Sequence, residues 1–185
     1  MTEAIDLLKE EHQLVKRVLQ VLRKKCWQVV KEGVVNYRDF EDILDFLKNY
    51  VDRQHHGKEE DILFDLMGRE LGDEIGSGPV TGMLIEHDLG RQYVSGLENS
   101  LKQHEKGDEE AVLDIIANSI SYTHLLHNHI EREDMILFEL ARRSLSDQAK
   151  EELNRRMSQA MKEKTASDSQ EKYRQKVEKW EGALP

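Results

Sequence analysis

Apolar residues recur every three to four positions along four long stretches of the chain, with charged residues between them. This spacing places the apolar side chains on one face of an α-helix. The stretches predict helices over about residues 3–31, 37–71, 80–106 and 109–143. The clearest loop runs from Gly68 to Gly82, where further glycines and a proline interrupt the pattern. Long amphipathic helices with short connections predict an all-α fold, an up-down-up-down four-helix bundle.

The pattern becomes more polar after the fourth helix. We expect the bundle to occupy residues 1–145 and a C-terminal helical extension to occupy residues 146–185. Within that extension, residues 163–171 are polar and are expected to be flexible. The last apolar residues follow at helical spacing: Tyr173, Val177, Trp180 and Leu184. This stripe is expected to pack on the bundle or on another copy of the chain, which would make a homo-oligomer.

Composition narrows the classes of function. The 185 residues include 27 Lys and Arg against 37 Asp and Glu, which gives a net charge of −10. This charge argues against nucleic acid and against an anionic membrane as partners. The single cysteine, Cys26, excludes an intrachain disulfide and a cysteine-based zinc site. The acidic N-terminus lacks a signal-peptide pattern and no apolar run is long enough to cross a membrane, so we expect a cytoplasmic protein.

Two ten-residue segments, 55–64 and 129–138, align without a gap. Each has a histidine, three residues, a glutamate, an acidic residue, one further residue and then Ile-Leu-Phe. In a helix, the histidine and the glutamate four positions later share a face and lie about 6 Å apart along the axis. An imidazole and a carboxylate in this arrangement form half of a metal site, and two helices would supply a complete one.

The histidine–glutamate pairs interrupt apolar stripes. His55 with Glu59, and His129 with Glu133, lie on the same helical faces as leucines and isoleucines. Glutamate is rarely buried without a partner. A single pair of this kind would more simply be a core histidine bonded to its own glutamate. Because two aligned copies occur, we favour metal ligation.

The other two helices each add a histidine on an apolar face. The predicted metal ligands are His12, His55, Glu59, His87, His129 and Glu133. Mixed nitrogen and carboxylate ligands suit iron, with manganese or zinc as alternatives. Six ligands suit two ions if Glu59 and Glu133 each bridge both, with a solvent-derived oxo or hydroxo bridge completing the centre.

The remaining histidines are expected to be less important. His56 shares a helical face with charged residues, and His104 lies near a loop, so both are expected on the surface. His124 and His127 have weaker apolar support and are minor candidates for metal binding. Tyr122 is expected in the core, either as a packing residue or near the metal.

At these positions the chain resembles the hemerythrin family, in the branch called HHE cation-binding domains, over about residues 3–143. The resemblance rests on Glu11-His12, His55 with Glu59, Glu86-His87-Asp88, His129-Ile130, Glu133-Asp134 and Phe138. It implies a non-haem di-iron centre inside the bundle, with both glutamates bridging. It also implies a protein that binds or senses dioxygen or a related small molecule, such as another diatomic or a peroxide.

The chain departs from the oxygen-carrying hemerythrins at two positions. Those proteins have a ligand histidine where this chain has Arg91, so we expect an extra open position on the nearby iron. They also have an aspartate at the position of Asp134, and we favour Glu133 because the first copy of the motif matches it. The open position favours redox chemistry over reversible oxygen carriage. Alternatives are therefore an enzyme or iron-handling protein for peroxide, nitric oxide or iron–sulfur repair chemistry, or a bundle with a purely structural polar core.

Overall fold

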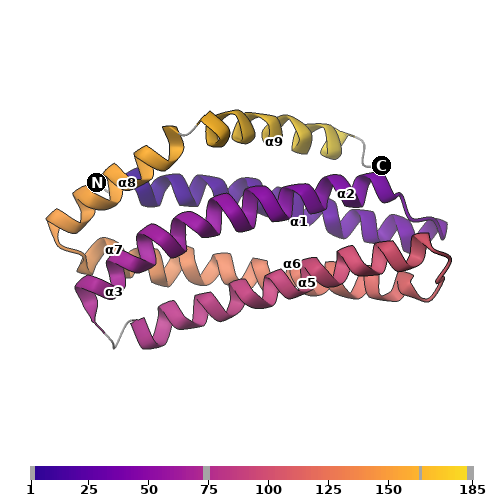
Figure 1. The fold of residues 1–185 in the computed structure, drawn as a ribbon, viewed down its shortest axis with the longest axis horizontal. Coiled ribbons are helices and arrows are strands. Elements are labelled where there is room, and N and C mark those ends of the chain that lie inside the picture. The colour runs from indigo at the N-terminus through magenta and orange to yellow at the C-terminus, as the bar shows by residue number, and fades with distance from the viewer. Residues whose placement is uncertain (1–2, 73–75, 163, 183–185) are drawn as a thin grey trace.

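The computed structural model describes residues 3–72, 76–162 and 164–182. These residues form an all-helical fold and include no strand. The long helical stretches lie side by side along the longest axis of the molecule, and the C-terminal helices lie over them (Figure 1). The prediction of an all-α chain is therefore confirmed.

The four predicted stretches are helical. The second and fourth contain wider, π-helical segments, and another such segment leads into the third. In chain order, the elements are α1 (Glu3–Glu32), α2 (Tyr37–Phe46), η1 (Leu47–His56), η2 (Glu59–Phe64), α3 (Asp65–Leu71), η3 (Gly76–Val80), α5 (Thr81–Glu105), α6 (Ala111–Arg132), η4 (Glu133–Leu137), α7 (Phe138–Ser144), α8 (Asp147–Lys162) and α9 (Lys164–Gly182). The loop predicted from Gly68 to Gly82 is shorter than expected, because α3 continues to Leu71 and η3 begins at Gly76. Residues 73–75 lie outside the described residues.

The turn between α1 and α2 has clear local causes. Gly33 has φ +68°, a left-handed conformation that ends helices and that glycine adopts without steric cost. Asn36 then begins α2, and its side-chain oxygen accepts a hydrogen bond from the backbone N–H of Asp39 at 3.3 Å. These two residues reverse the chain and set α2 against α1.

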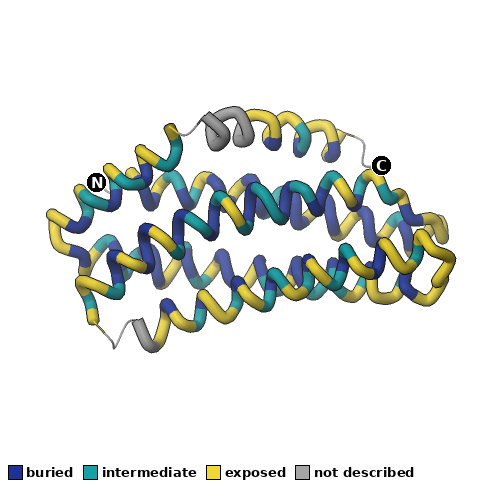
Figure 2. Tube along the Cα trace, viewed as in Figure 1, coloured by how far each residue is buried: buried dark blue, intermediate teal, exposed yellow. Residues whose placement is uncertain are grey.

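Two apolar clusters fill the interior, and the predicted ligands lie between them. One cluster includes Val15, Val51 and Val94. The other includes Leu8 and Leu63. Along each helical stretch the ligand positions fall where one cluster gives way to the other. Buried residues continue along the inward faces of the helices through this region (Figure 2), so the polar residues there are enclosed by core on both sides.

The C-terminal helices pack on the rest of the same chain. Tyr173, Val177 and Trp180 are buried, and the Tyr173 ring packs edge-on against Phe46 with ring centroids 5.3 Å apart. The Tyr173 hydroxyl donates to Asp45 Oδ2 at 3.1 Å. These three side chains therefore pack on the bundle of their own chain, which is the first of the two expected arrangements. Leu184 lies outside the described residues.

The predicted flexible segment, 163–171, is largely helical. Helix α9 begins at Lys164, and residue 163 lies outside the described residues. Helix α8 shares an apolar cluster with the bundle through Ala149, Leu153 and Met157. The extension thus adds to the core of the bundle.

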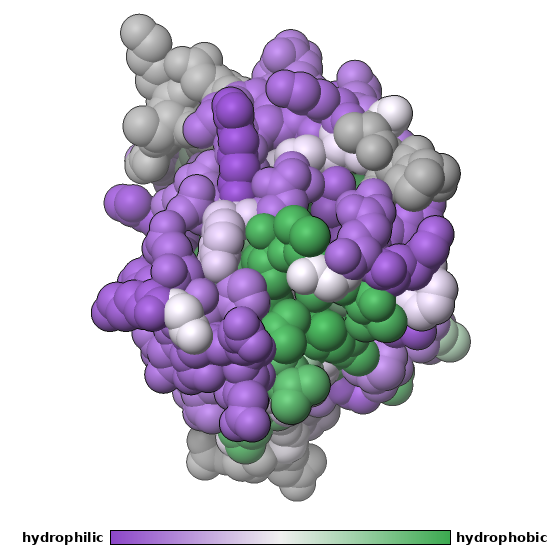
Figure 3. All heavy atoms as spheres, turned by 90° about the vertical axis from the view of Figure 1, so that its right-hand side faces the viewer, coloured by the Kyte–Doolittle hydropathy of each residue, from purple (hydrophilic) through white to green (hydrophobic). Residues whose placement is uncertain are grey.

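An apolar area lies on the surface at one end of the molecule. Figure 3 shows this area at the end where α1 finishes and α6 begins. Val30, Val34 and Leu113, which belong to these parts of the chain, are exposed. None of the described helices combines the length and apolar character needed to span a membrane.

Candidate metal centre

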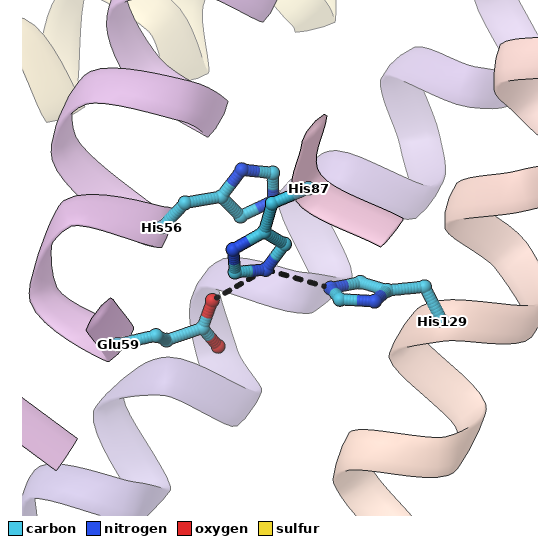
Figure 4. Close-up of side chains that lie close together, drawn as sticks. All are labelled: His56, Glu59, His87 and His129. Atoms are coloured by element: carbon cyan, nitrogen blue, oxygen red, sulfur yellow. Dashed lines mark hydrogen bonds and ion pairs between the residues drawn. The ribbon is translucent and has the colours of Figure 1, made fainter. Parts of the chain in front are cut away.

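All six predicted ligands meet in the interior. They come from α1, η1, η2, α5, α6 and η4, and each is at most 2% exposed: His12, His55, Glu59, His87, His129 and Glu133. One further histidine, His56, joins them. Figure 4 shows His56 and Glu59 from the second helical stretch facing His87 and His129 from α5 and α6.

The side chains form two adjoining groups with the donor atoms of metal sites. The first group is His12, His55, Glu59 and Glu133, and the second is His56, Glu59, His87 and His129. In each group, one ligand atom from every residue lies within 4.8 Å of the others. Because Glu59 belongs to both groups, the arrangement suits two adjacent ions.

The two glutamates lie between the groups. Glu59 Oε1 is 3.3 Å from His55 Nε2, whereas Glu59 Oε2 is 3.7 Å from His87 Nε2. The two oxygens of one carboxylate thus face different histidine sets. Glu133 Oε2 is 3.3 Å from His12 Nε2 and 3.2 Å from His129 Nε2. Both carboxylates are placed where a bridging ligand would be needed.

Many of these polar atoms are buried without hydrogen bonds. Within the described part of the chain, both carboxylate oxygens of Glu59, both of Glu133 and His12 Nε2 have no hydrogen-bond partner. Burying an unpartnered carboxylate costs several kcal/mol. Burial, and then the nearby charge of Glu133, raise the pKa of Glu59 well above its usual value. A cation placed between the carboxylates would remove this cost, so the residues fit a metal centre.

His55 and His87 are in the protonation state that binds metal. Burial lowers the pKa of His55 and of His87, so both are neutral at pH 7. A neutral imidazole has a free lone pair, which a metal ion requires. His12 differs: burial alone would lower its pKa, but the hydrogen bond to Asp134 and the nearby charge of Glu133 outweigh burial and raise it.

A ring of carboxylates orients four of the histidines. Each carboxylate accepts a hydrogen bond from an Nδ1–H: Glu11 from His55 at 2.8 Å, Glu60 from His87 at 2.6 Å, Glu86 from His129 at 2.9 Å, and Asp134 from His12 at 2.8 Å. The acid on each helical stretch holds the histidine of the next stretch, and the fourth holds the first. Bonding at Nδ1 fixes the tautomer and leaves Nε2 for the metal.

Each of these carboxylates also has a basic partner. The pairs are Asp134 with Lys16 at 3.2 Å, Glu60 with Arg91 at 2.6 Å, Glu11 with Lys58, and Glu86 with Arg132. The bases balance the outer carboxylates, so the charge on Glu59 and Glu133 remains available to ions. Spacing along the sequence predicted no hydrogen-bonding role for these four acids. The feature of the sequence that could have identified them is their position, since each is the immediate neighbour of a predicted ligand.

The prediction that His56 lies on the surface was wrong. Its side chain is 3% exposed, and its ring stacks on that of His87 with centroids 3.8 Å apart and an interplanar angle of 12°. His56 ends the π-helical segment η1. Such a segment spreads one turn over more residues than an α-helix does, which reduces the 100° between successive side chains. Adjacent His55 and His56 can then both face inward.

The buried position of His56 also removes the reason to expect an open metal position near Arg91. The Arg91 guanidinium contacts Asp52 at 2.7 Å, Asp88 at 2.8 Å and Glu60 at 2.6 Å. Arginine cannot ligate a cation. However, His56 supplies a third imidazole to the group that contains His87 and His129. This group therefore holds three imidazoles although residue 91 is an arginine.

The other histidines lie outside both groups. His104 Nδ1 is 2.5 Å from the Tyr37 hydroxyl. His127 forms an exposed pair with Glu131 at 3.4 Å, and His124 is also exposed. Tyr122 is buried in the core, as expected, and lies beside a pocket that also includes His56 and His87.

His56→Ala is expected to reduce the metal content of the purified protein from two ions per chain towards one, because it removes one of three imidazoles from a single group. Elemental analysis of protein reconstituted under identical conditions measures this. His104→Ala is the control and should retain both ions. Full metal content in His56→Ala would show that His56 is only a packing residue.

A comparison with known families agrees with this geometry. The model of the hemerythrin HHE cation-binding domain matches residues 3–141. No curated protein and no solved structure matches the chain. The matched region contains every residue of the two ligand groups and all four orienting carboxylates.

Proposed function

Because the chain belongs to the hemerythrin family of HHE cation-binding domains, we propose that it binds two iron ions and uses them to bind or sense dioxygen or a related small molecule. The proposed ligands are the six predicted from the sequence together with His56. We also propose that residues 3–144 form the up-down-up-down four-helix bundle expected of this family.

The observation that carries the proposal is the placement of Glu59. Its two oxygens face different histidine groups, and neither has a hydrogen-bond partner among the described residues although the side chain is fully buried. A purely structural polar core would satisfy these oxygens with donors. Two cations explain both the orientation and the missing donors, whereas a single ion would leave one histidine group without a role.

The donor set supports iron. It contains imidazoles and carboxylates only, and the one cysteine, Cys26, lies in an apolar cluster with Val29. Magnesium and calcium prefer shells of oxygen alone. Iron accepts mixed nitrogen and oxygen ligands, and manganese and zinc are the competing ions. When bound, an iron pair would supply two electrons and a position for an external ligand.

The two groups differ in ways that favour binding of a small molecule. One contains three imidazoles and the other contains two, His12 and His55. If both glutamates served both ions, an ion held by His12 and His55 would have fewer protein ligands than its neighbour, and an external molecule would bind there. The His12 ring stacks on Phe138 with centroids 5.5 Å apart, and Leu8 and Leu63 nearby are fully buried. Apolar walls of this kind exclude water from the ligand.

Dioxygen binding is expected to be reversible, because His56 replaces the imidazole whose loss suggested an open, easily oxidised iron. Protein reconstituted with ferrous iron should contain two ions per chain. Its visible absorption should change on mixing with oxygen and revert under argon. Stopped-flow absorption and elemental analysis measure these two properties.

Two results would contradict this proposal. A protein that takes up at most one ion, or only zinc after anaerobic iron reconstitution, would exclude the di-iron centre. Irreversible oxidation within minutes would instead favour a redox or iron-handling role. Arg91→Ala is an informative control, because Arg91 contacts the carboxylate that holds His87 but is not itself a ligand.

A further inference from the structure

A pocket of about 280 Å³ lies between η1 and α5, beside the group with three imidazoles. His56 and His87 form the part nearest the proposed metal centre, and Leu47 and Val94 are among its apolar walls. We propose that this pocket binds a small uncharged organic molecule that carries a hydroxyl group. Contact between the bound molecule and the metal centre rests on the proposed function, whereas binding of the molecule to the pocket does not.

The volume argues for an organic molecule. A water molecule occupies about 30 Å³ of liquid, so the pocket has room for about nine waters. A diatomic molecule needs only a small part of this space. Small-molecule pockets in proteins begin at about 300 Å³, and they combine mainly apolar walls with a few polar groups. This pocket is close to that size, and Leu47, Val94 and the Tyr122 ring supply apolar surface beside its polar groups.

The charges around the pocket favour an uncharged ligand. Lys48 Nζ is 2.6 Å from Glu98 Oε2. Arg91, the other base in the lining, contacts three carboxylates. Both bases are therefore already paired, and an anion would also approach the carboxylates of Asp52 and Glu98. An uncharged molecule avoids this repulsion and needs no counter-charge.

His56 and Tyr122 provide polar contacts for a hydroxyl group. Neither ring nitrogen of His56 is hydrogen-bonded to a residue that the structure describes, and its Nδ1 is 3.6 Å from Asp52 Oδ1, which is too long for a hydrogen bond. The four other ligand histidines have a carboxylate at 2.6–2.9 Å. If one nitrogen of His56 binds metal, the other is left to donate to a ligand.

The Tyr122 hydroxyl also lacks a hydrogen bond to any residue in the described part of the chain, although a buried tyrosine usually has one. Burial raises the pKa of Tyr122, so its hydroxyl remains protonated. Two buried polar side chains without hydrogen-bond partners among the described residues thus line one pocket. A ligand hydroxyl could accept from one of them and donate to the other.

Phenol is a suitable probe, because it is uncharged at pH 7 and has one hydroxyl on an apolar ring. Isothermal calorimetry with the full chain should detect phenol binding, and benzoate, a similar ring with a negative charge, should bind at least tenfold more weakly. Ser95 is exposed and lines the pocket. Ser95→Trp should weaken phenol binding at least tenfold by filling the pocket. Ser95→Ala, the matched control, should bind like the unmodified protein.

Unchanged phenol binding in Ser95→Trp, benzoate binding as tight as phenol, or no phenol binding at millimolar concentration would each overturn the proposal. Metal content and melting temperature are measured on the same samples, so a misfolded variant is recognised. Calorimetry on metal-free protein tests the pocket even if the di-iron proposal fails. In the iron-loaded protein, the proton relaxation of bound phenol should be faster than in the metal-free protein, and equal rates would refute the contact with the centre.

Discussion

Replacing Glu59 with glutamine is expected to empty both metal positions and, at the same time, to stabilise the metal-free protein. Glu59 is the one side chain that belongs to both ligand groups. Glutamine preserves its shape but removes the charge that attracts the ions. Elemental analysis should therefore give well below one ion per chain, against two for the unmodified protein.

The opposite effect on the metal-free protein follows from burial. Burial and the charge of Glu133 raise the pKa of Glu59, which shows that its ionised form is unfavourable in the empty core. A neutral amide should increase the free energy of unfolding of the metal-free protein by about 1 kcal/mol or more, roughly 2–4 °C in melting temperature for a chain of this size. Thermal unfolding with a chelator present measures this.

The two measurements separate a metal ligand from a structural residue. If Glu59 served only to hydrogen-bond His55, the glutamine variant would keep its metal content or lower the stability of the metal-free protein. Glu131→Gln is the matched control, because Glu131 is an exposed glutamate on α6. It should change neither metal content nor stability.

Removing the metal should lower the melting temperature of the unmodified protein substantially. Ions that bind only the folded state stabilise it by about 2.7 kcal/mol per site when the free metal concentration is a hundred times the dissociation constant. For a domain of 150–250 residues, this corresponds to about 5–10 °C per site. Calorimetry before and after chelation measures the shift, and re-addition of ferrous iron under anaerobic conditions should restore it.

The loss of stability should be greatest around the ligands. Hydrogen exchange should increase in η1, η2 and η4, which contain or begin with ligand residues. It should change little around Phe46, which packs against the C-terminal helix through Tyr173. Calcium should not restore the protein, because it prefers oxygen ligands. Equal melting temperatures with and without iron would exclude a metal centre in the core.

The sequence by itself determined the helical class and most of the proposed ligand set. The apolar period located the long helical stretches, because burial of one face requires that spacing. The duplicated motif identified His55, Glu59, His129 and Glu133, because a pair separated by four residues shares a helical face whatever the tertiary fold. His12 and His87 followed from their positions on apolar stripes. All six are buried together in the structure.

Tertiary structure decided the features that depend on contacts between helices or on local helix geometry. His56 could not be identified, because an ideal α-helical period places it on the charged face and only the π-helical segment η1 turns it inward. The ring of orienting carboxylates joins residues that are far apart in the chain, so sequence spacing contains no information on which acid holds which histidine. The same holds for the final stripe, whose helical spacing suits either an intrachain or an intermolecular contact. Packing against Phe46 selected the intrachain one, because that apolar ring lies within reach of Tyr173.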